Sequence, residues 1–277
     1  MRVLAIARDI LREAISRKWV LALAAGTTLL IALAALGLRL EVVDGALAAS
    51  RFFGGRVGHE IRAADVALRP LFEGIAYAVF YGGIAFGLLA CADFAPALLA
   101  PGRIEHLLSL PVRRAEIVVG VFLGVEALVL CGALYGGAGL AAVVWVKTGV
   151  FGWGPVASAA LAVTGFAGVY AAMLLSAVVV RSAAVSALAG GVVFVAGIVA
   201  GNRATLAPLF SPGAGRRAFL VATAPFPHLP GLAEVGGRIA GAQPVDPRAL
   251  AALVAGTLVF ATALLAFAVV RFDRRDF

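Results

Sequence analysis

The stretch "APGRIEHLLSLPVRRAEIVVG", residues 100–120, is a charged interruption between two long apolar runs. Pro101 and Pro111 bracket a short segment whose apolar side chains share one helix face by i, i+3 and i, i+4 spacing, namely Ile104, Leu107 and Leu108. The other face carries Arg103, Glu105, His106 and Ser109, and Arg113 and Arg114 follow Pro111. Because so short a helix is unstable in water alone, the pattern predicts a helix lying on a membrane. The alternative is a solvated loop with topology-determining charges.

The composition indicates an integral membrane protein. Of 277 residues, 62% are hydrophobic and 14% are charged, with a mean hydropathy of +1.03. Soluble domains carry roughly 45–50% apolar and about 25% charged residues. The net charge of +8 comes from basic residues that stand at the ends of apolar runs. That placement is typical of lipid headgroup contacts, so nucleic acid is not expected as a partner.

Six apolar runs reach the length of about 20 residues that a helix needs to cross a bilayer. They are residues 20–38, 74–92, 117–146, 155–180, 182–201 and 249–270. We therefore expect an all-α polytopic protein, with one transmembrane domain over residues 1–277. Only Arg181 and its neighbours separate the fourth run from the fifth, which predicts a tight helical hairpin. The outer connections, residues 39–73 and 202–248, are long enough to hold interfacial or re-entrant helices.

The positions of Lys and Arg predict that both termini are cytoplasmic, because the basic residues of the inner side are packed into the shorter segments. Residues 1–19 show an amphipathic helical period, with Arg8, Arg12 and Arg17 on the polar face and Trp19 at headgroup level. This segment is expected to lie on the inner membrane surface. Two alternatives are an extension of the first span into water and a signal peptide. The apolar run exceeds the roughly 7–15 residues of a signal peptide.

The sequence "GRIEHLLSLPVRRAEIVVGVFLG" resembles the intracellular segment of type-2 ATP-binding-cassette (ABC-2) permeases. The N-terminal "IARDILREAISRKW" is similar to the elbow helix of that family, and "VVRFDRRDF" to its basic tail. The most similar subgroup includes permeases of nitrous-oxide-reductase maturation and of gliding motility. The chain departs from the family pattern at Arg103, where Thr is common, and at Val121, where Lys follows the glycine.

The resemblance implies an ATP-driven exporter subunit in a bacterial inner membrane, paired with a second permease copy or a paralogue. Segment 93–116 would be the coupling segment that contacts a separate ATPase subunit. The residues implied in that contact are Arg103, Ile104, Glu105, Leu107, Leu108, Ser109, Arg113 and Arg114. The chain itself would need no cofactor, since ATP and Mg would be bound by the ATPase.

The residues themselves carry no enzyme motif. The sequence has no Gly-x-x-x-x-Gly-Lys-Ser/Thr phosphate loop, and its two cysteines, Cys91 and Cys131, have no metal-ligand spacing. Glu126 lies inside the third apolar run and is a candidate intramembrane functional residue. The alternative is a shallow, paired carboxylate. Two other functions stay open: a secondary transporter or channel that needs no ATPase, and a scaffold that transmits force to a periplasmic partner.

Overall fold

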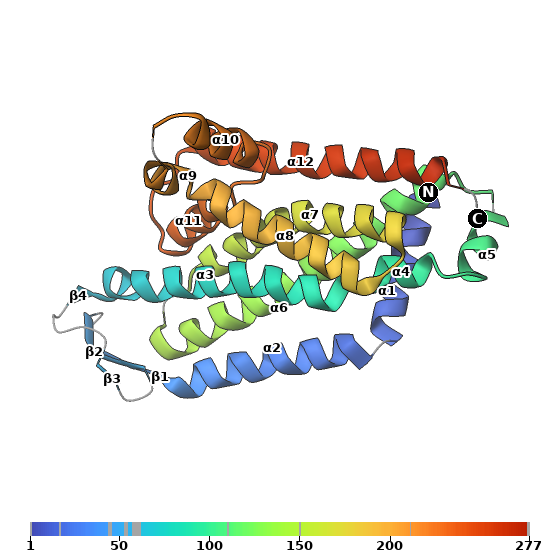
Figure 1. Ribbon diagram of the computed structural model, residues 1–277. Helices are drawn as coiled ribbons and strands as arrows, with labels where there is room; N and C mark the ends of the chain where they lie inside the picture. Colours follow the sequence, from blue (N-terminus) through green and yellow to red (C-terminus); the bar gives the residue numbers. More distant parts are fainter. Residues whose placement is uncertain are drawn as a thin grey trace.

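The computed structural model describes residues 2–16, 18–43, 46–52, 55–56, 62–109, 111–149, 151–210 and 212–275, and not the side chains of residues 37–68. Long helices run side by side along one axis, and both ends of the chain lie at the same end of the bundle (Figure 1). We name this the terminal end and the opposite one the distal end. The helices are α1 (Arg2–Ser16), α2 (Lys18–Gly37), α3 (Ala64–Cys91), α4 (Phe94–Leu98), α5 (Arg103–Ser109), α6 (Arg114–Thr148), α7 (Gly154–Val180), α8 (Ala183–Gly201), α9 (Arg203–Leu206), η1 (Ala207–Leu209), α10 (Ala214–Thr223), α11 (Leu229–Ala240) and α12 (Pro247–Asp273).

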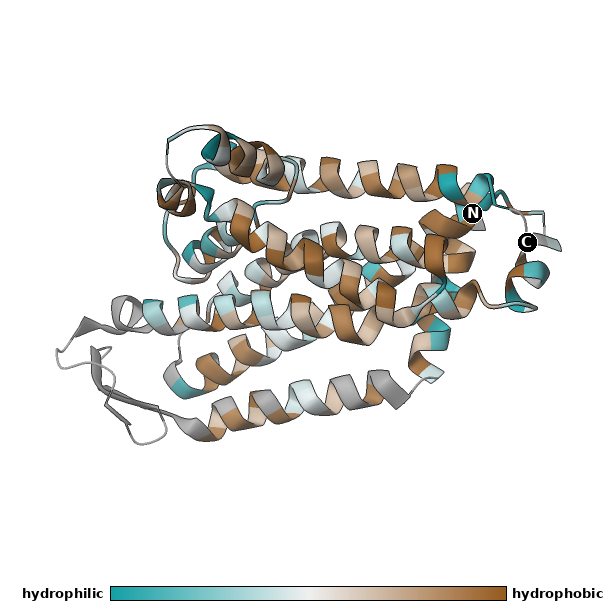
Figure 2. Ribbon diagram, in the orientation of Figure 1, coloured by the Kyte–Doolittle hydropathy of each residue, from teal (hydrophilic) through white to brown (hydrophobic). Residues whose placement is uncertain are grey.

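Among the described residues, five helices are long and apolar enough to cross a membrane: Phe72–Leu98, Arg114–Lys147, Gly154–Val180, Ala183–Gly201 and Pro247–Asp273. They coincide with the second to sixth apolar runs of the sequence. Apolar residues cover the middle of these helices, and hydrophilic residues gather at both ends (Figure 2). The expected helical membrane protein is thereby confirmed. Helix α2 runs alongside α6 (Figure 1). Its described apolar stretch, Ala24–Leu33, is shorter than a membrane span, so a sixth span stays a prediction.

The outer connection 39–73 adds a small sheet to the helical bundle. It holds a small antiparallel sheet of four strands: β1 (Leu38–Val43), β2 (Ala46–Phe52), β3 (Gly55–Arg56) and β4 (Arg62–Ala63). Strand β1 pairs with β2 in a register that places Leu38 opposite Phe52, and β2 also pairs with β3 and β4. Helix α3 then starts at Ala64, ten residues before the apolar run that predicted it. It contains Pro70.

Helix α7 is the centre of the bundle. Phe166, Tyr170 and Met173 on this helix are fully buried, and α3, α6, α8, α11 and α12 all pack around it. Close packing is possible where glycine faces an aromatic ring, since a Cβ added at Gly87 would lie 2.9 Å from Phe166. The predicted hairpin is present: α7 ends at Val180, Arg181 adopts a left-handed φ of 57°, and α8 begins at Ala183.

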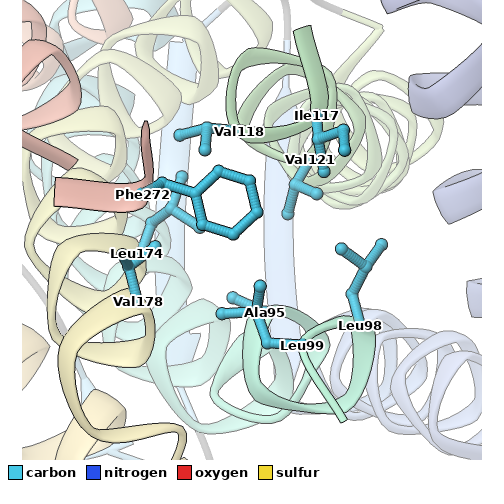
Figure 3. A pocket seen from close by; sticks show the side chains of 9 residues that line it. All are labelled: Ala95, Leu98, Leu99, Ile117, Val118, Val121, Leu174, Val178 and Phe272. Atoms are coloured by element: carbon cyan, nitrogen blue, oxygen red, sulfur yellow. The ribbon is translucent and has the colours of Figure 1, made fainter. Parts of the chain in front are cut away.

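Helix α4 fills the terminal end of the core. A cavity of about 10 Å³ lies between α4, α6, α7 and α12, and it is lined by apolar side chains (Figure 3), among them Leu98, Val121, Leu174 and Phe272. One water molecule needs roughly 10–15 Å³ and two or more polar partners. The cavity is therefore a packing defect and not a ligand site.

Helix α1 crosses the terminal end of the bundle transversely, and α2 turns away from it to run along the bundle (Figure 1). The apolar face of α1 packs on α6, and Ala7, Ile10 and Ala14 of α1 are buried in that contact. Two apolar residues of the predicted membrane-facing side, Leu4 and Ile15, are each 69% exposed. The amphipathic period therefore serves two surfaces: a protein-facing stripe and a narrower stripe open to lipid.

The connection 202–248 contains the short helices α9, η1, α10 and α11. Helix α11 re-enters the bundle between α3, α7 and α8, and it buries Leu229, Leu232 and Ala233 completely. A Cβ added at Gly154, where α7 begins, would overlap Ala240 at the end of α11, with 2.4 Å to its Cα. The expectation of interfacial or re-entrant helices in this connection is met by α11, which lies among the long helices.

The contact between α1 and α6 should be sensitive to side-chain size at Gly124. A Cβ at this position would lie 2.8 Å from Ile10 Cβ and 3.0 Å from Ala7 O, so Gly124→Ala has to displace α1. We expect a loss of about 1–3 kcal/mol, which is typical of overpacking, measured as a lower midpoint of thermal unfolding in detergent.

Gly191 on α8 is the matched control, because a Cβ there meets nothing within 4 Å. Gly191→Ala should leave the midpoint unchanged or raise it slightly. Equal midpoints for the two variants would contradict the packing of α1 on α6.

Candidate functional site

The short helix α5, Arg103–Ser109, is held to the terminal end of the bundle by its apolar face. Ile104 is 1% exposed and belongs to the main core, and Leu107 is partly buried against that core. Glu105 and Ser109 are exposed on the other face. The amphipathic arrangement expected from the sequence is present for these residues, while the side chains of Leu108 and His106 lie outside the described part of the chain.

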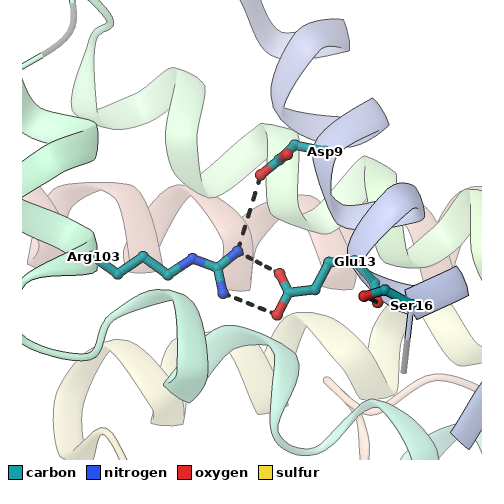
Figure 4. A network of polar contacts seen from close by, with 4 residues as sticks. All are labelled: Asp9, Glu13, Ser16 and Arg103. Carbon is teal, nitrogen blue, oxygen red and sulfur yellow. Dashed lines mark hydrogen bonds and ion pairs between the residues drawn. The ribbon is translucent and has the colours of Figure 1, made fainter. Parts of the chain in front are cut away.

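Arg103 ties α5 to α1 through a paired contact with Glu13 (Figure 4). Its Nη1 donates to Glu13 Oε1 at 2.9 Å, its Nη2 contacts Glu13 Oε2, and Asp9 Oδ2 lies at 4.0 Å. The side chain of Arg103 is 35% exposed and that of Glu13 is 18% exposed, so the pair is partly shielded from water. The hydrogen bonds to Glu13 raise the pKa of Arg103, which is therefore a fixed cation.

This contact changes the interpretation of Arg103. The sequence pattern placed its side chain on the charged face with Glu105 and Ser109, whereas the structure directs it toward α1. Arg17, which stands four residues after Glu13 in the sequence, lies outside the described residues. Sequence reasoning missed the role of Glu13 because 90 residues separate it from Arg103, and no local spacing pairs them.

Two further arginines join the long helices at the terminal end. Arg114 at the start of α6 donates from Nη1 to the carbonyl oxygens of Asp273 at 2.9 Å and Arg275 at 2.7 Å. Arg275 donates in turn to the carbonyl oxygens of Val178 and Val179 at the end of α7, the latter at 3.1 Å. Cations at helix C-termini bind the last carbonyl groups, which have no partner within the helix, and they interact favourably with the helix dipole. Helices α6, α12 and α7 are thereby linked.

The remaining sequence-predicted residues lie apart from these contacts. Arg113 is exposed and precedes α6, where its backbone N–H donates to Glu116 Oε2 at 2.8 Å. Arg8 and Arg12 are exposed on the outer face of α1. Trp19 belongs to α2, and its side chain lies outside the described part of the chain. The exposed charged side chains in and next to α5 are therefore Glu105, within the helix, and Arg113, after it. The apolar contacts of α5 do not cover them.

Glu126 lies on α6, twelve residues beyond the start of that helix at Arg114. This distance is about 18 Å at about 1.5 Å per residue, and α1 crosses α6 at Gly120 and Gly124, just before Glu126. Within the described structure, Glu126 Oε1 and the hydroxyl of Tyr170 are both buried without a hydrogen-bond partner. Tyr170 stacks on Phe122 across the α6–α7 contact, with ring centroids 6.0 Å apart.

This environment bears on the two interpretations of Glu126. Glu126 lies twelve residues after the first residue of α6 and twenty-two before the last, and both interpretations of its depth stay predictions. The pairing that the shallow interpretation expects is absent at Oε1 in the described structure. A buried polar atom without a partner is costly, so Glu126 remains a candidate functional residue.

No family model matches the chain, and no curated protein matches it.

The Arg103–Glu13 pair should show measurable coupling in a double-mutant cycle. Arg103→Gln and Glu13→Gln each break two charge-assisted hydrogen bonds, and the double variant should be less destabilised than the sum of the two. For a partly exposed pair with paired geometry we expect a coupling of about 1–2 kcal/mol from thermal or denaturant unfolding in detergent.

Asp9→Asn is the control within the same helix, since Asp9 is 65% exposed and 4.0 Å from Arg103. We expect a change of less than about 0.5 kcal/mol for this variant. A coupling of zero between Arg103 and Glu13 would mean that the pair does not hold α5 to α1.

Replacing Glu126 with an apolar residue should raise the stability of the chain. Glu126→Met removes a buried polar atom without a partner, and this relieves a cost of about 1–3 kcal/mol, so the unfolding midpoint should rise. The control is Glu73→Met on α3, because Gln243 donates to the Glu73 carboxylate and the midpoint should fall. A lower midpoint for Glu126→Met would show that the carboxylate has a stabilising partner.

Proposed function

We propose that the chain is the membrane-spanning permease subunit of an ATP-driven transporter of the ABC-2 type, whose ATP is hydrolysed by a separate ATPase subunit. The proposal starts from the resemblance of residues 102–124 and of the N-terminal segment to that family. It is supported by one observation: α5 exposes Glu105 and Ser109 at the terminal end while Ile104 and Arg103 tie it to the bundle and to α1.

A coupling element has to present a surface to its partner and transmit displacement to the spans. Helix α5 meets the second requirement through Ile104, which is buried in the core, and through Arg103, which is bonded to Glu13 of α1. Helix α1 in turn lies against the backbone of α6 at Gly120 and Gly124. A push on α5 would therefore reach α6 through α1, and it would reach the main core through Ile104.

The terminal end also links the spans that would have to change their packing. Arg114 binds the last carbonyl groups of α12, and Arg275 binds those of α7. We propose that closure of the ATPase on ATP binding displaces α1 and α5 together. The arginine contacts would then transmit this displacement to α12 and α7. The transporter would contain a second permease copy or a paralogue, in a bacterial inner membrane, with the terminal end facing the cytoplasm.

A second candidate function is a secondary transporter or channel that needs no ATPase. It is favoured by the buried, unpartnered Glu126 Oε1 and Tyr170 hydroxyl, because ionisable groups inside a helical bundle commonly mark ion or proton pathways. This candidate requires activity from the purified chain alone. The ABC-2 proposal requires an ATPase subunit whose activity depends on the chain.

Charge reversal at Glu105 tests the ABC-2 proposal. Glu105 is exposed, so Glu105→Arg should leave the unfolding midpoint of the purified chain unchanged. A like charge or a lost salt bridge in an interface commonly costs 2 kcal/mol or more, and we expect at least ten-fold less ATPase subunit to co-purify. The measurement is co-purification from membranes that contain both subunits, with ATP hydrolysis in nanodiscs as a second readout.

The matched control is Glu234→Arg on α11, which is also exposed but lies at the distal end, where its partner is Arg238. This variant should retain the ATPase subunit. Equal retention by the Glu105 and Glu234 variants, or the absence of any co-purifying ATPase with the unmodified chain, would overturn the proposal.

A further inference from the structure

The segment that follows α8 starts where α8, as a membrane span, would reach the lipid headgroups. Helix α8, Ala183–Gly201, has 19 residues, which span about 28 Å at about 1.5 Å per residue. The hydrocarbon core of a bilayer is about 30 Å thick, so α8 is just long enough to cross it. Helices α9 and α10 follow at the distal end of the bundle (Figure 1), where α10 packs against α8. They therefore begin at the membrane surface.

This segment is basic. Residues 202–233 contain Arg203, Arg216 and Arg217 and neither aspartate nor glutamate. Arg216 and Arg217 are exposed on α10, and Arg203 is partly exposed on α9. Burial, together with the charge of Arg203, lowers the pKa of His228, so this histidine adds no positive charge at neutral pH. The positive charge of the segment thus comes from the three arginines.

The same segment exposes apolar side chains beside these arginines. Leu209 is 78% exposed and Val221 is 73% exposed, with Phe210 and Leu220 exposed to a smaller extent. Phe210 stacks on Phe219 with ring centroids 4.7 Å apart, which joins the end of η1 to α10. Helix α10 buries Thr223 and no other residue, so it has almost no core of its own.

We propose that this segment lies in the headgroup layer of the distal leaflet and binds anionic phospholipid through Arg203, Arg216 and Arg217. Leu209, Leu220 and Val221 would enter the acyl boundary, and the arginines would reach the phosphates, as basic and apolar residues do on interfacial helices. A soluble acidic partner fits less well, because the length of α8 places these apolar side chains inside the headgroup layer. The proposal does not depend on the ABC-2 assignment.

The first test measures the depth of α10 with spin labels on the full chain in nanodiscs of POPC and POPG at a ratio of 3:1. Cys131 is exposed and is replaced by serine, whereas Cys91 is buried and is kept. Labels are placed at Val221, at Val259 on α12 as the lipid reference, and at Glu105 as the water reference. The measured quantity is the ratio of the collision rate with oxygen to the collision rate with an aqueous nickel complex. We expect this ratio to exceed one at Val221, as at Val259. Collision rates like those at Glu105 would overturn the proposal and leave this face to a soluble partner.

The second test measures lipid selectivity. The variant Arg216→Gln/Arg217→Gln is compared with Arg238→Gln/Arg248→Gln, which removes the same charge from exposed positions at the same end. Retained POPG and POPC are counted by native mass spectrometry after purification in detergent. We expect the Arg216/Arg217 variant to retain at least two-fold less POPG than the control variant, with POPC unchanged. Equal POPG retention, or equal loss of POPC and POPG, would contradict an anionic lipid site.

Discussion

Two glycines on α6 allow α1 to lie against its backbone, and the terminal end is arranged around that contact. Gly120 and Gly124 have no side chain to hold α1 away, so Ile6 and Ile10 reach the α6 backbone. This position brings Glu13 within hydrogen-bond distance of Arg103 on α5. The transverse helix thus links the short charged segment to a membrane-spanning helix, and a larger residue at either glycine would separate all three.

The apolar pattern was sufficient to predict most of the bundle. Five long apolar helices and the hairpin at Arg181 follow from run lengths and from the interruption of hydrophobicity. The amphipathic character of α1 and of α5 could also be read from residue spacing. The sheet in the connection 39–73 was not predicted, although Leu38, Arg39, Leu40, Glu41 and Val42 alternate as in a strand, since its pairing partners β3 and β4 have only two residues each. Helix α11 was foreseen only as a possibility, since Leu229, Leu232 and Ala233 give no signal that distinguishes a buried helix from an interfacial one.

The candidate site was less predictable than the fold because its contacts join residues far apart in the sequence. Arg103 pairs with Glu13, and Arg114 donates to the carbonyl oxygens of Phe272, Asp273 and Arg275, so neither set of partners could be found from local spacing. The sequence identified α5 correctly as a charged, amphipathic element. It could not show that one of its charges is used inside the chain while Glu105 remains exposed.

Joint movement of α1 and α5 can be measured by pulsed electron paramagnetic resonance on the proposed complex with an ATPase subunit in nanodiscs. In a Cys131→Ser background, one label pair joins Arg8→Cys on α1 to Ser109→Cys on α5, and a second joins Ser109→Cys to Arg274→Cys after α12. If α1 and α5 move together, ATP changes the second distance and leaves the first unchanged. A change in the α1–α5 distance with ATP, or no change in either distance, would contradict joint movement.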